Sequence, residues 1–246
     1  MELAPPLAAR PPPPATIHWI LPPHGMGNHL DSLPALASAA VGKDFKNYMP
    51  HFRPFLSFGL SNHQEHQVCA VAVGVVGDIC RALEAEMSPY CPEIVQLLLK
   101  NLQEPALNRN VKPPILSCFG DVALAVGGDF EPYLPETMRM LQQAGMTSLD
   151  VSNPDLVDYL GQLREGIFEA YTGVLQGLRE GKKGTAFQPY LPDAMNLLLR
   201  VLRASYERTG RSSPSAHGSV DRHGRAHVFP VVAALCEQDQ HIVIVA

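Results

Sequence analysis

The residues of this chain that could bind a metal ion are few and do not cluster. His63 and His66 stand three places apart at the start of an expected helix, but this is not the HExxH zinc pattern and no further ligand is evident. His223 and His227 lie in a stretch rich in Ser, Gly and Arg. We interpret all four histidines as solvated side chains and predict neither a metal site nor a bound cofactor.

Two aspartates recur at equivalent places and could suggest acid–base chemistry. Asp78 and Asp121 each follow a glycine and stand 12 residues before a tyrosine, Tyr90 and Tyr133 respectively. Because the two carboxylates belong to different copies of one pattern, we favour a structural role, such as hydrogen bonding between repeats. The sequence also contains no phosphate-binding glycine loop, GxSxG motif or Cys/His nucleophile pattern, so we predict that the protein is not an enzyme.

A third set of carboxylates directly follows a recurring proline. Glu93, Glu136 and Asp193 occupy this position in three copies of a Tyr-x-Pro motif, and His51 occupies it in the first copy. Acids in the first turn of a helix complement the helix dipole, an effect of about 0.3–1 kcal/mol. We weight this interpretation above the alternative, in which the three acids form part of a surface that binds a basic segment.

The prolines belong to a repeat with a period near 40 residues. Tyr-x-Pro begins at Tyr48, Tyr90, Tyr133 and Tyr190, with spacings of 42, 43 and 57 residues. An apolar residue also stands three places before each tyrosine: Phe45, Met87, Phe130 and Phe187. Proline fits the first turn of a helix, where its missing N–H would be unpaired anyway. Each Tyr-x-Pro therefore predicts the start of a second helix, helix B, and the period is typical of stacked helical arrays.

A first helix, helix A, is expected before each Tyr-x-Pro. Gly42 and Gly127 precede two of these motifs in related sequences, and they can adopt the left-handed conformation that closes the preceding helix. The expected A helices are Ser32–Val41 (short), Gln64–Glu84, Val111–Val126 and a long one from Pro154 through Leu178. The expected B helices begin at the four prolines; the last three span Pro92–Leu102, Pro135–Ala144 and Pro192–Ala204.

The second A helix is apolar around most of its circumference between residues 68 and 79, which predicts burial on most sides. We expect Gly74 and Gly77 to allow close approach of neighbouring helices. Neither end of the array carries an obvious polar cap, as in a fragment of a longer solenoid. The predicted fold is an all-α superhelix of about four helix pairs in residues 31–204.

Composition sets further limits on the function. The 246 residues are 46% apolar and carry a formal charge of −5, which disfavours nucleic acid and suits basic peptides. The five cysteines form no CxxC pair and are expected to be reduced, buried thiols. The longest apolar run, Val68–Gly77, is too short to cross a bilayer, so we predict no membrane insertion. Residues 1–30 are proline-rich and expected to be disordered, and residues 205–246 depart from the repeat and are expected to form a poorly ordered tail.

Three stretches of the chain resemble the importin-β (karyopherin-β) family. They contain GVVGDICRAL at residues 74–83, FGDVALAVGG at 119–128 and EAYTGVLQGL at 169–178. The resemblance is colinear over about residues 34–204 and is specific to the C-terminal half of the importin-β superhelix. It implies HEAT repeats and a role in nuclear protein import, in the cytoplasm, the nucleus and the nuclear pore of the envelope.

The resemblance also implies binding partners. These are the basic segment of importin-α or another basic cargo segment, and phenylalanine–glycine (FG) nucleoporins in hydrophobic clefts between repeats. Family B helices line the concave surface, so Glu93, Glu136 and Asp193 are the candidate partner-binding residues. Ran-GTP contacts lie largely in N-terminal repeats that this chain lacks, so Ran is expected only where those are present. The alternatives are a HEAT scaffold of another multiprotein complex or a non-functional truncated fragment.

Overall fold

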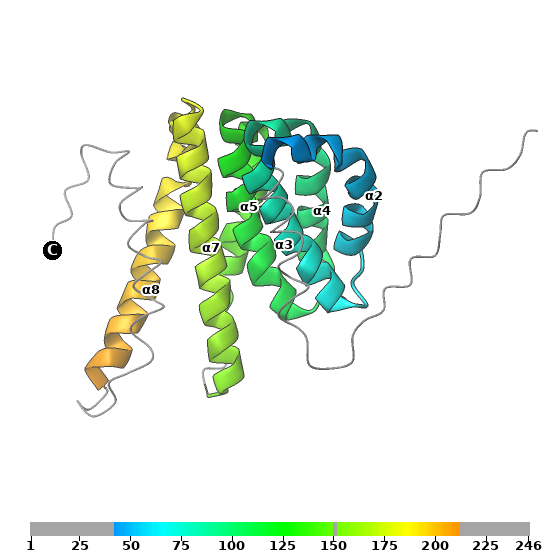
Figure 1. The fold of residues 1–246 in the computed structure, drawn as a ribbon. Coiled ribbons are helices and arrows are strands. Elements are labelled where there is room, and N and C mark those ends of the chain that lie inside the picture. The colour runs from blue at the N-terminus through cyan, green and yellow to red at the C-terminus, as the bar shows by residue number, and fades with distance from the viewer. Residues whose placement is uncertain (1–41, 150–151, 212–246) are drawn as a thin grey trace, which may run out of the picture.

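A computed structural model describes residues 42–149 and 152–211, with side chains up to Ala204, and these residues form a stack of helices without strands (Figure 1). The A helices are α3 (His66–Leu83), α5 (Lys112–Val126) and α7 (Pro154–Glu180). The B helices are α2 (Met49–Leu60), α4 (Cys91–Gln103), α6 (Leu134–Gly145) and α8 (Leu191–Arg211). The all-helical prediction is confirmed. The expected helix Ser32–Val41, His223, His227, Cys236 and residues 1–30 and 212–246 lie outside the described residues.

A short 3-10 helix precedes each B helix. The four segments are η1 (Gly42–Asn47), η2 (Glu84–Tyr90), η4 (Gly127–Tyr133) and η5 (Gly184–Tyr190), and a fifth, η3 (Arg109–Val111), precedes α5. The residue after each recurring tyrosine begins helix B, so the recurring proline lies in its first turn, as predicted. The apolar residue three places before each tyrosine is buried beneath the turn. The sequence repeat therefore corresponds to the same turn before each of the four B helices.

Three of these four turns begin with a residue whose φ angle is positive. Gly127 ends α5 with φ 58°, as expected; Gly42 has φ 56°, and the helix expected before it lies outside the described residues. Glu84 occupies the equivalent place after α3 with φ 49° and ψ −129°. Since this region strongly favours glycine, Glu84 stores backbone strain that the sequence pattern did not reveal.

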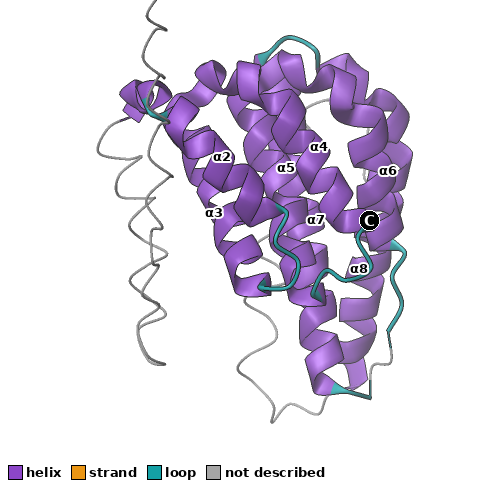
Figure 2. Ribbon diagram, turned by 90° about the vertical axis from the view of Figure 1, so that its right-hand side faces the viewer, coloured by secondary structure: helices purple, strands orange, loops and turns teal. Residues whose placement is uncertain are grey.

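Helices α5 and α7 pack with their backbones in close contact. Figure 2 shows the same stack turned by 90°, with the described residues in helices and the loops between them. A Cβ atom added at Gly173 would lie 2.5 Å from the Gly120 carbonyl oxygen, and one at Gly177 would lie 2.2 Å from that of Ala123. At Gly74 no described atom lies within 4 Å of the virtual Cβ, so the described residues show no close approach there. Gly77 does permit a close approach, with Asp121 Oδ2 at 2.7 Å from that position. The glycines of α7 therefore meet backbone atoms of α5, whereas Gly77 meets a side chain.

Helix α3 is less buried than its composition predicted. Val68 and Val71 are 40% and 43% exposed, which contradicts burial on most sides. Val111, which stands at the place of Val68 in the next repeat, is buried in the core. The exposure of Val68 follows from its position in the stack, because within the described residues α5 has an A helix on each side, whereas α3 has one on only one side. Val71 and its counterpart Pro114 are both exposed.

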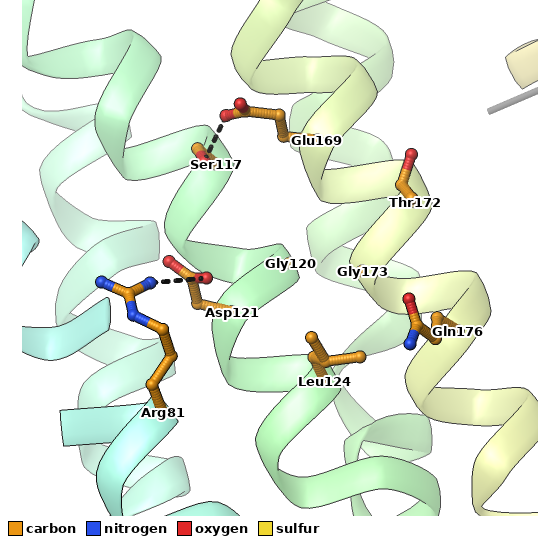
Figure 3. Close-up of a pocket in the computed structure, with 9 residues that line it drawn as sticks. All are labelled: Arg81, Ser117, Gly120, Asp121, Leu124, Glu169, Thr172, Gly173 and Gln176. Carbon is orange, nitrogen blue, oxygen red and sulfur yellow. Dashed lines mark hydrogen bonds and ion pairs between the residues drawn. The ribbon is translucent and has the colours of Figure 1, made fainter. Parts of the chain in front are cut away.

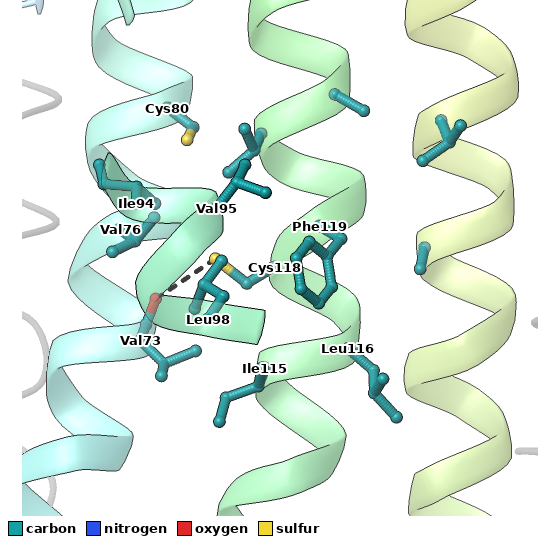
Figure 4. Close-up of a cluster of buried hydrophobic side chains, with 14 of the residues drawn as sticks. Val73, Val76, Cys80, Ile94, Val95, Leu98, Ile115, Leu116, Cys118 and Phe119 are labelled. Atoms are coloured by element: carbon teal, nitrogen blue, oxygen red, sulfur yellow. Dashed lines mark hydrogen bonds between the residues drawn. The ribbon is translucent and has the colours of Figure 1, made fainter. Parts of the chain in front are cut away.

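One apolar core runs through the stack (Figure 4). Cys80 and Cys118 lie within it, together with Cys69 and Cys91, and all four are free buried thiols, as expected. Burial raises the pKa of the Cys91 thiol to about 11, so it stays protonated at neutral pH. Within the described ranges no helix is both long and apolar enough to span a bilayer.

Candidate partner-binding surfaces

The three candidate carboxylates lie at matching places on successive B helices, and each bonds to the B helix before it. Glu93 accepts hydrogen bonds from Arg53 Nε at 2.5 Å and Ser57 Oγ at 2.9 Å, both on α2. Asp193 accepts one from Gln142 Nε2 on α6 at 2.9 Å. These acids therefore connect neighbouring helices, a role that sequence reasoning missed because the donors lie far away in the chain.

Glu136 shows the same arrangement with an added ion pair. It accepts from Gln103 Nε2 on α4 at 3.4 Å and from both Nε and Nη2 of Arg139, one turn along its own helix. The hydrogen bond from Arg139 lowers the pKa of the Glu136 carboxyl below its usual value. Glu136 is therefore charged at neutral pH and already has a cationic partner.

Charge on the B helices is mixed. Among the B-helix residues whose side chains the structure describes, up to Ala204, these three acids occur with five cations: Arg53, Lys100, Arg139, Arg200 and Arg203. Glu93 and Glu136 are paired with arginines, whereas Asp193 is exposed and its hydrogen bond comes from a neutral amide. Asp193 is thus the candidate acid whose charge is least compensated by the described side chains around it.

A cleft opens on the opposite side, between the A helices (Figure 3). It measures about 410 Å3 and is lined by α3, α5 and α7. Leu124, 39% exposed, lies along one wall, and Gly120 and Gly173 lie where α5 and α7 meet. Between the B helices α2 and α4, by contrast, a hollow of only about 10 Å3 remains. The A side therefore offers the more spacious cleft between repeats.

Polar residues of this cleft join consecutive A helices. Arg81 on α3 contacts Asp78 on its own helix at 2.5 Å and Asp121 on α5 at 3.2 Å. Ser117 Oγ on α5 donates to Glu169 on α7 at 2.6 Å. Asp121 thus has the inter-repeat structural role that the spacing suggested, whereas Asp78 pairs with Arg81 of its own helix.

The pKa of the Asp121 carboxyl lies above its usual value. Burial raises the pKa of its carboxyl, Arg81 partly offsets that effect, and the nearby Glu169 and Asp78 raise the pKa further. The carboxylate is therefore costly to ionise where it stands, despite its arginine partner.

The histidine prediction is only partly correct. His66 is exposed, but His63 is half-buried, with Nε2 2.6 Å from Asn101 Oδ1 and Nδ1 4.0 Å from Glu104. Burial at the junction of α3 and α4 explains why solvation was the wrong interpretation for His63. Across the described part of the chain, no three His, Cys, Asp or Glu side chains form a group that could hold a metal ion.

Comparisons with known proteins find relatives in one family. A family model described as importin subunit beta-1-like, TPR repeats, matches residues 32–225. Importin subunit beta-1 of Arabidopsis thaliana is 48% identical over 166 residues, which cover 67% of this chain and 19% of that protein.

Solved structures give the same result. A crystal structure of importin beta in a polyethylene glycol condition superposes with a TM-score of 0.72 and 31% identity, covering 87% of this chain and 24% of that one. A Kap95:Nup1 complex gives a TM-score of 0.68 at 28% identity, covering 82% of this chain and 22% of that one. The chain spans about a fifth of the length of the curated relative and about a quarter of the solved chains.

Proposed function

Because the chain belongs to the importin subunit beta-1-like family, we propose that it forms a partner-binding segment of a nuclear import receptor. Importin-β proteins are HEAT-repeat transport receptors and not enzymes. The proposed partners are a basic segment of importin-α or another cargo, and FG nucleoporins. The proposed location is the cytoplasm, the nucleus and the nuclear pore, and Ran-GTP is expected only where N-terminal repeats are also present.

The basic segment would bind along the B helices. The observation that carries this proposal is the recurrence of a carboxylate at the same position on α4, α6 and α8. A bound lysine or arginine would have to compete with Arg53 at Glu93 and with Arg139 at Glu136. Asp193 has only the neutral Gln142 to release, so it should contribute most. Electrostatic attraction of this kind weakens as salt is added.

An FG nucleoporin would bind on the other side, in the cleft between the A helices. Its volume of about 410 Å3 lies in the range typical of ligand pockets, and the exposed Leu124 supplies apolar surface for a phenylalanine ring. The solved Kap95:Nup1 complex concerns a protein of the same fold. The two proposed partners therefore occupy opposite sides and need not compete.

Calorimetric titration of a basic importin-α N-terminal peptide into the full chain tests the first assignment. Replacing Asp193 with Asn should weaken binding by up to about fivefold, the effect of one exposed ion pair. Glu93→Gln and Glu136→Gln should have smaller effects. Asp158→Asn, which removes an exposed acid from the A helix α7, is the matched control and should leave binding unchanged. Equal weakening by Asp193→Asn and Asp158→Asn would refute the B-helix assignment.

An FG-repeat peptide tests the second assignment. Leu124→Glu should abolish its binding and leave that of the basic peptide intact. Leu199→Glu, a matched change at an exposed leucine on helix α8, is the control. Retention of FG binding by Leu124→Glu would place that partner elsewhere.

A further inference from the structure

Successive B helices meet through the same two faces. Counted from the recurring tyrosine, the leading face comprises the tyrosine and the residues three, four and seven places after it. The trailing face comprises the residues one, five, eight, nine and twelve places after it. The hollow between α2 and α4 is lined by the trailing face of α2 and the leading face of α4. Within it, Ser57 bonds to Glu93, and Leu60 and Leu97 line the same space.

The contact between α6 and α8 repeats this register. Gln142, nine places after its tyrosine, bonds to Asp193, three places after the next one. Gly145 stands twelve places after Tyr133, and Leu197 stands seven places after Tyr190. A Cβ added at Gly145 would lie 2.8 Å from the Leu197 side chain. The chain therefore contains one B-to-B interface used repeatedly, with fixed partners on each face.

The leading face of α2 is not covered by any described residue. Tyr48, Phe52 and Phe55 are 52%, 38% and 59% exposed. The residues that correspond to Phe52 in the following helices are all buried: Ile94, Thr137 and Ala194. Three large aromatic side chains thus lie open at positions that the other B helices place against a neighbour.

The trailing face of α8 is open in the same way. Leu199 and Leu202 stand nine and twelve places after Tyr190 and are 46% and 41% exposed. In α4 the corresponding residues, Leu99 and Leu102, are partly buried against the core. The described stack therefore ends in two apolar faces, a leading face on α2 and a trailing face on α8. Their residues stand at the positions that pair with each other where B helices meet within the chain.

We propose that the trailing face of α8 in one copy binds the leading face of α2 in a second copy. Leu202 would then contact Phe55 of the second copy, in the way that Leu60 and Leu97 lie together inside the chain. Leu199 would lie beside His51 of the second copy. Joining unlike faces leaves one face free on each partner, so the association is head-to-tail and open-ended. Its interface continues the one between α6 and α8, and it is independent of the proposed import function.

Sedimentation velocity of the full 246-residue chain over a concentration series tests this proposal. The wild-type weight-average mass should rise with concentration beyond two chains. Phe55→Glu and Leu202→Glu should each sediment as single chains, because each variant has lost one face. An equimolar mixture of the two should form a dimer and nothing larger, since each supplies the face that the other lacks. Leu124→Glu, which changes a similarly exposed leucine on the A side, should associate as wild type does.

A wild-type mass of one chain at every concentration would overturn the proposal; this is the result expected if residues 1–41 or 212–246 cover the faces. Association that persists in the Phe55→Glu variant, or a mixture that stays monomeric, would also overturn it. Circular dichroism confirms that each variant is folded, and Phe55→Gln and Leu202→Gln replace any variant that is not.

Discussion

The close approach of α5 and α7 predicts opposite effects for the same substitution at two glycines of one helix. Gly161 on α7 is exposed, and no atom of the described residues lies within 4 Å of its virtual Cβ. Gly161→Ala should therefore stabilise the protein by about 1 kcal/mol, the difference in helix propensity. At Gly173 the added Cβ would lie 2.5 Å from the Gly120 oxygen and 2.6 Å from its carbonyl carbon and Cα.

Those three neighbours are backbone atoms, so they cannot move aside as a flexible side chain can. Ordinary contact requires roughly 1 Å more, and overpacking of this kind costs about 1–3 kcal/mol or more. After the propensity gain, Gly173→Ala should still destabilise the protein by up to about 2 kcal/mol, so the two variants should differ by about 1–3 kcal/mol.

Urea denaturation followed by circular dichroism measures both free energies of unfolding. The slope with denaturant should be the same for both variants, because they expose similar surface on unfolding. If Gly173→Ala were as stable as Gly161→Ala, the two helices could not be packed backbone to backbone as described.

Three further changes test other features of the fold. Glu84→Gly should stabilise the protein by about 1 kcal/mol in urea denaturation, because it relieves the backbone strain at this positive φ. That gain should outweigh the greater conformational entropy of glycine in the unfolded chain and the loss of an exposed ion pair with Lys43. Gly127→Ala should destabilise it by a similar amount, and a loss of stability in Glu84→Gly would contradict this reasoning. Thr137→Val should stabilise it by about 1 kcal/mol, since the buried Thr137 hydroxyl has no hydrogen-bond partner among the described residues; a thermal melt at or below the wild-type temperature would argue otherwise. The pKa of Asp121 is raised in the folded state, so its contribution to stability is present at low pH and is lost as pH rises above the usual aspartate value of about 4. Asp121→Asn should therefore reduce the fall in the free energy of unfolding between pH 4 and 7, measured by denaturation. The same fall in the variant as in the wild type would count against this reasoning.

The fold follows closely from local features of the sequence. The prolines at the start of each B helix and the glycines Gly42 and Gly127 act through their own backbone geometry, so their roles could be predicted without knowing the neighbours. The buried residue beneath each turn was also visible from its fixed spacing.

Contacts between repeats could not be predicted in the same way. Gly173 meets Gly120, and Gln142 meets Asp193, across 51 to 53 residues of chain. Which residues face each other there depends on how far the pairs rotate and slide, and periodicity within one helix does not specify that. The exposure of Val68 likewise depends on what lies beside α3 and not on the composition of the helix.

Binding of a basic segment along the B helices is the central claim, and a salt series tests it most directly. Fluorescence anisotropy with a labelled importin-α N-terminal peptide would give its affinity for the full chain at each salt concentration. The account predicts measurable binding at low salt that weakens steadily as salt is added, with a shallower dependence for Asp193→Asn. No binding at the lowest salt, or an affinity that does not change with salt, would contradict it.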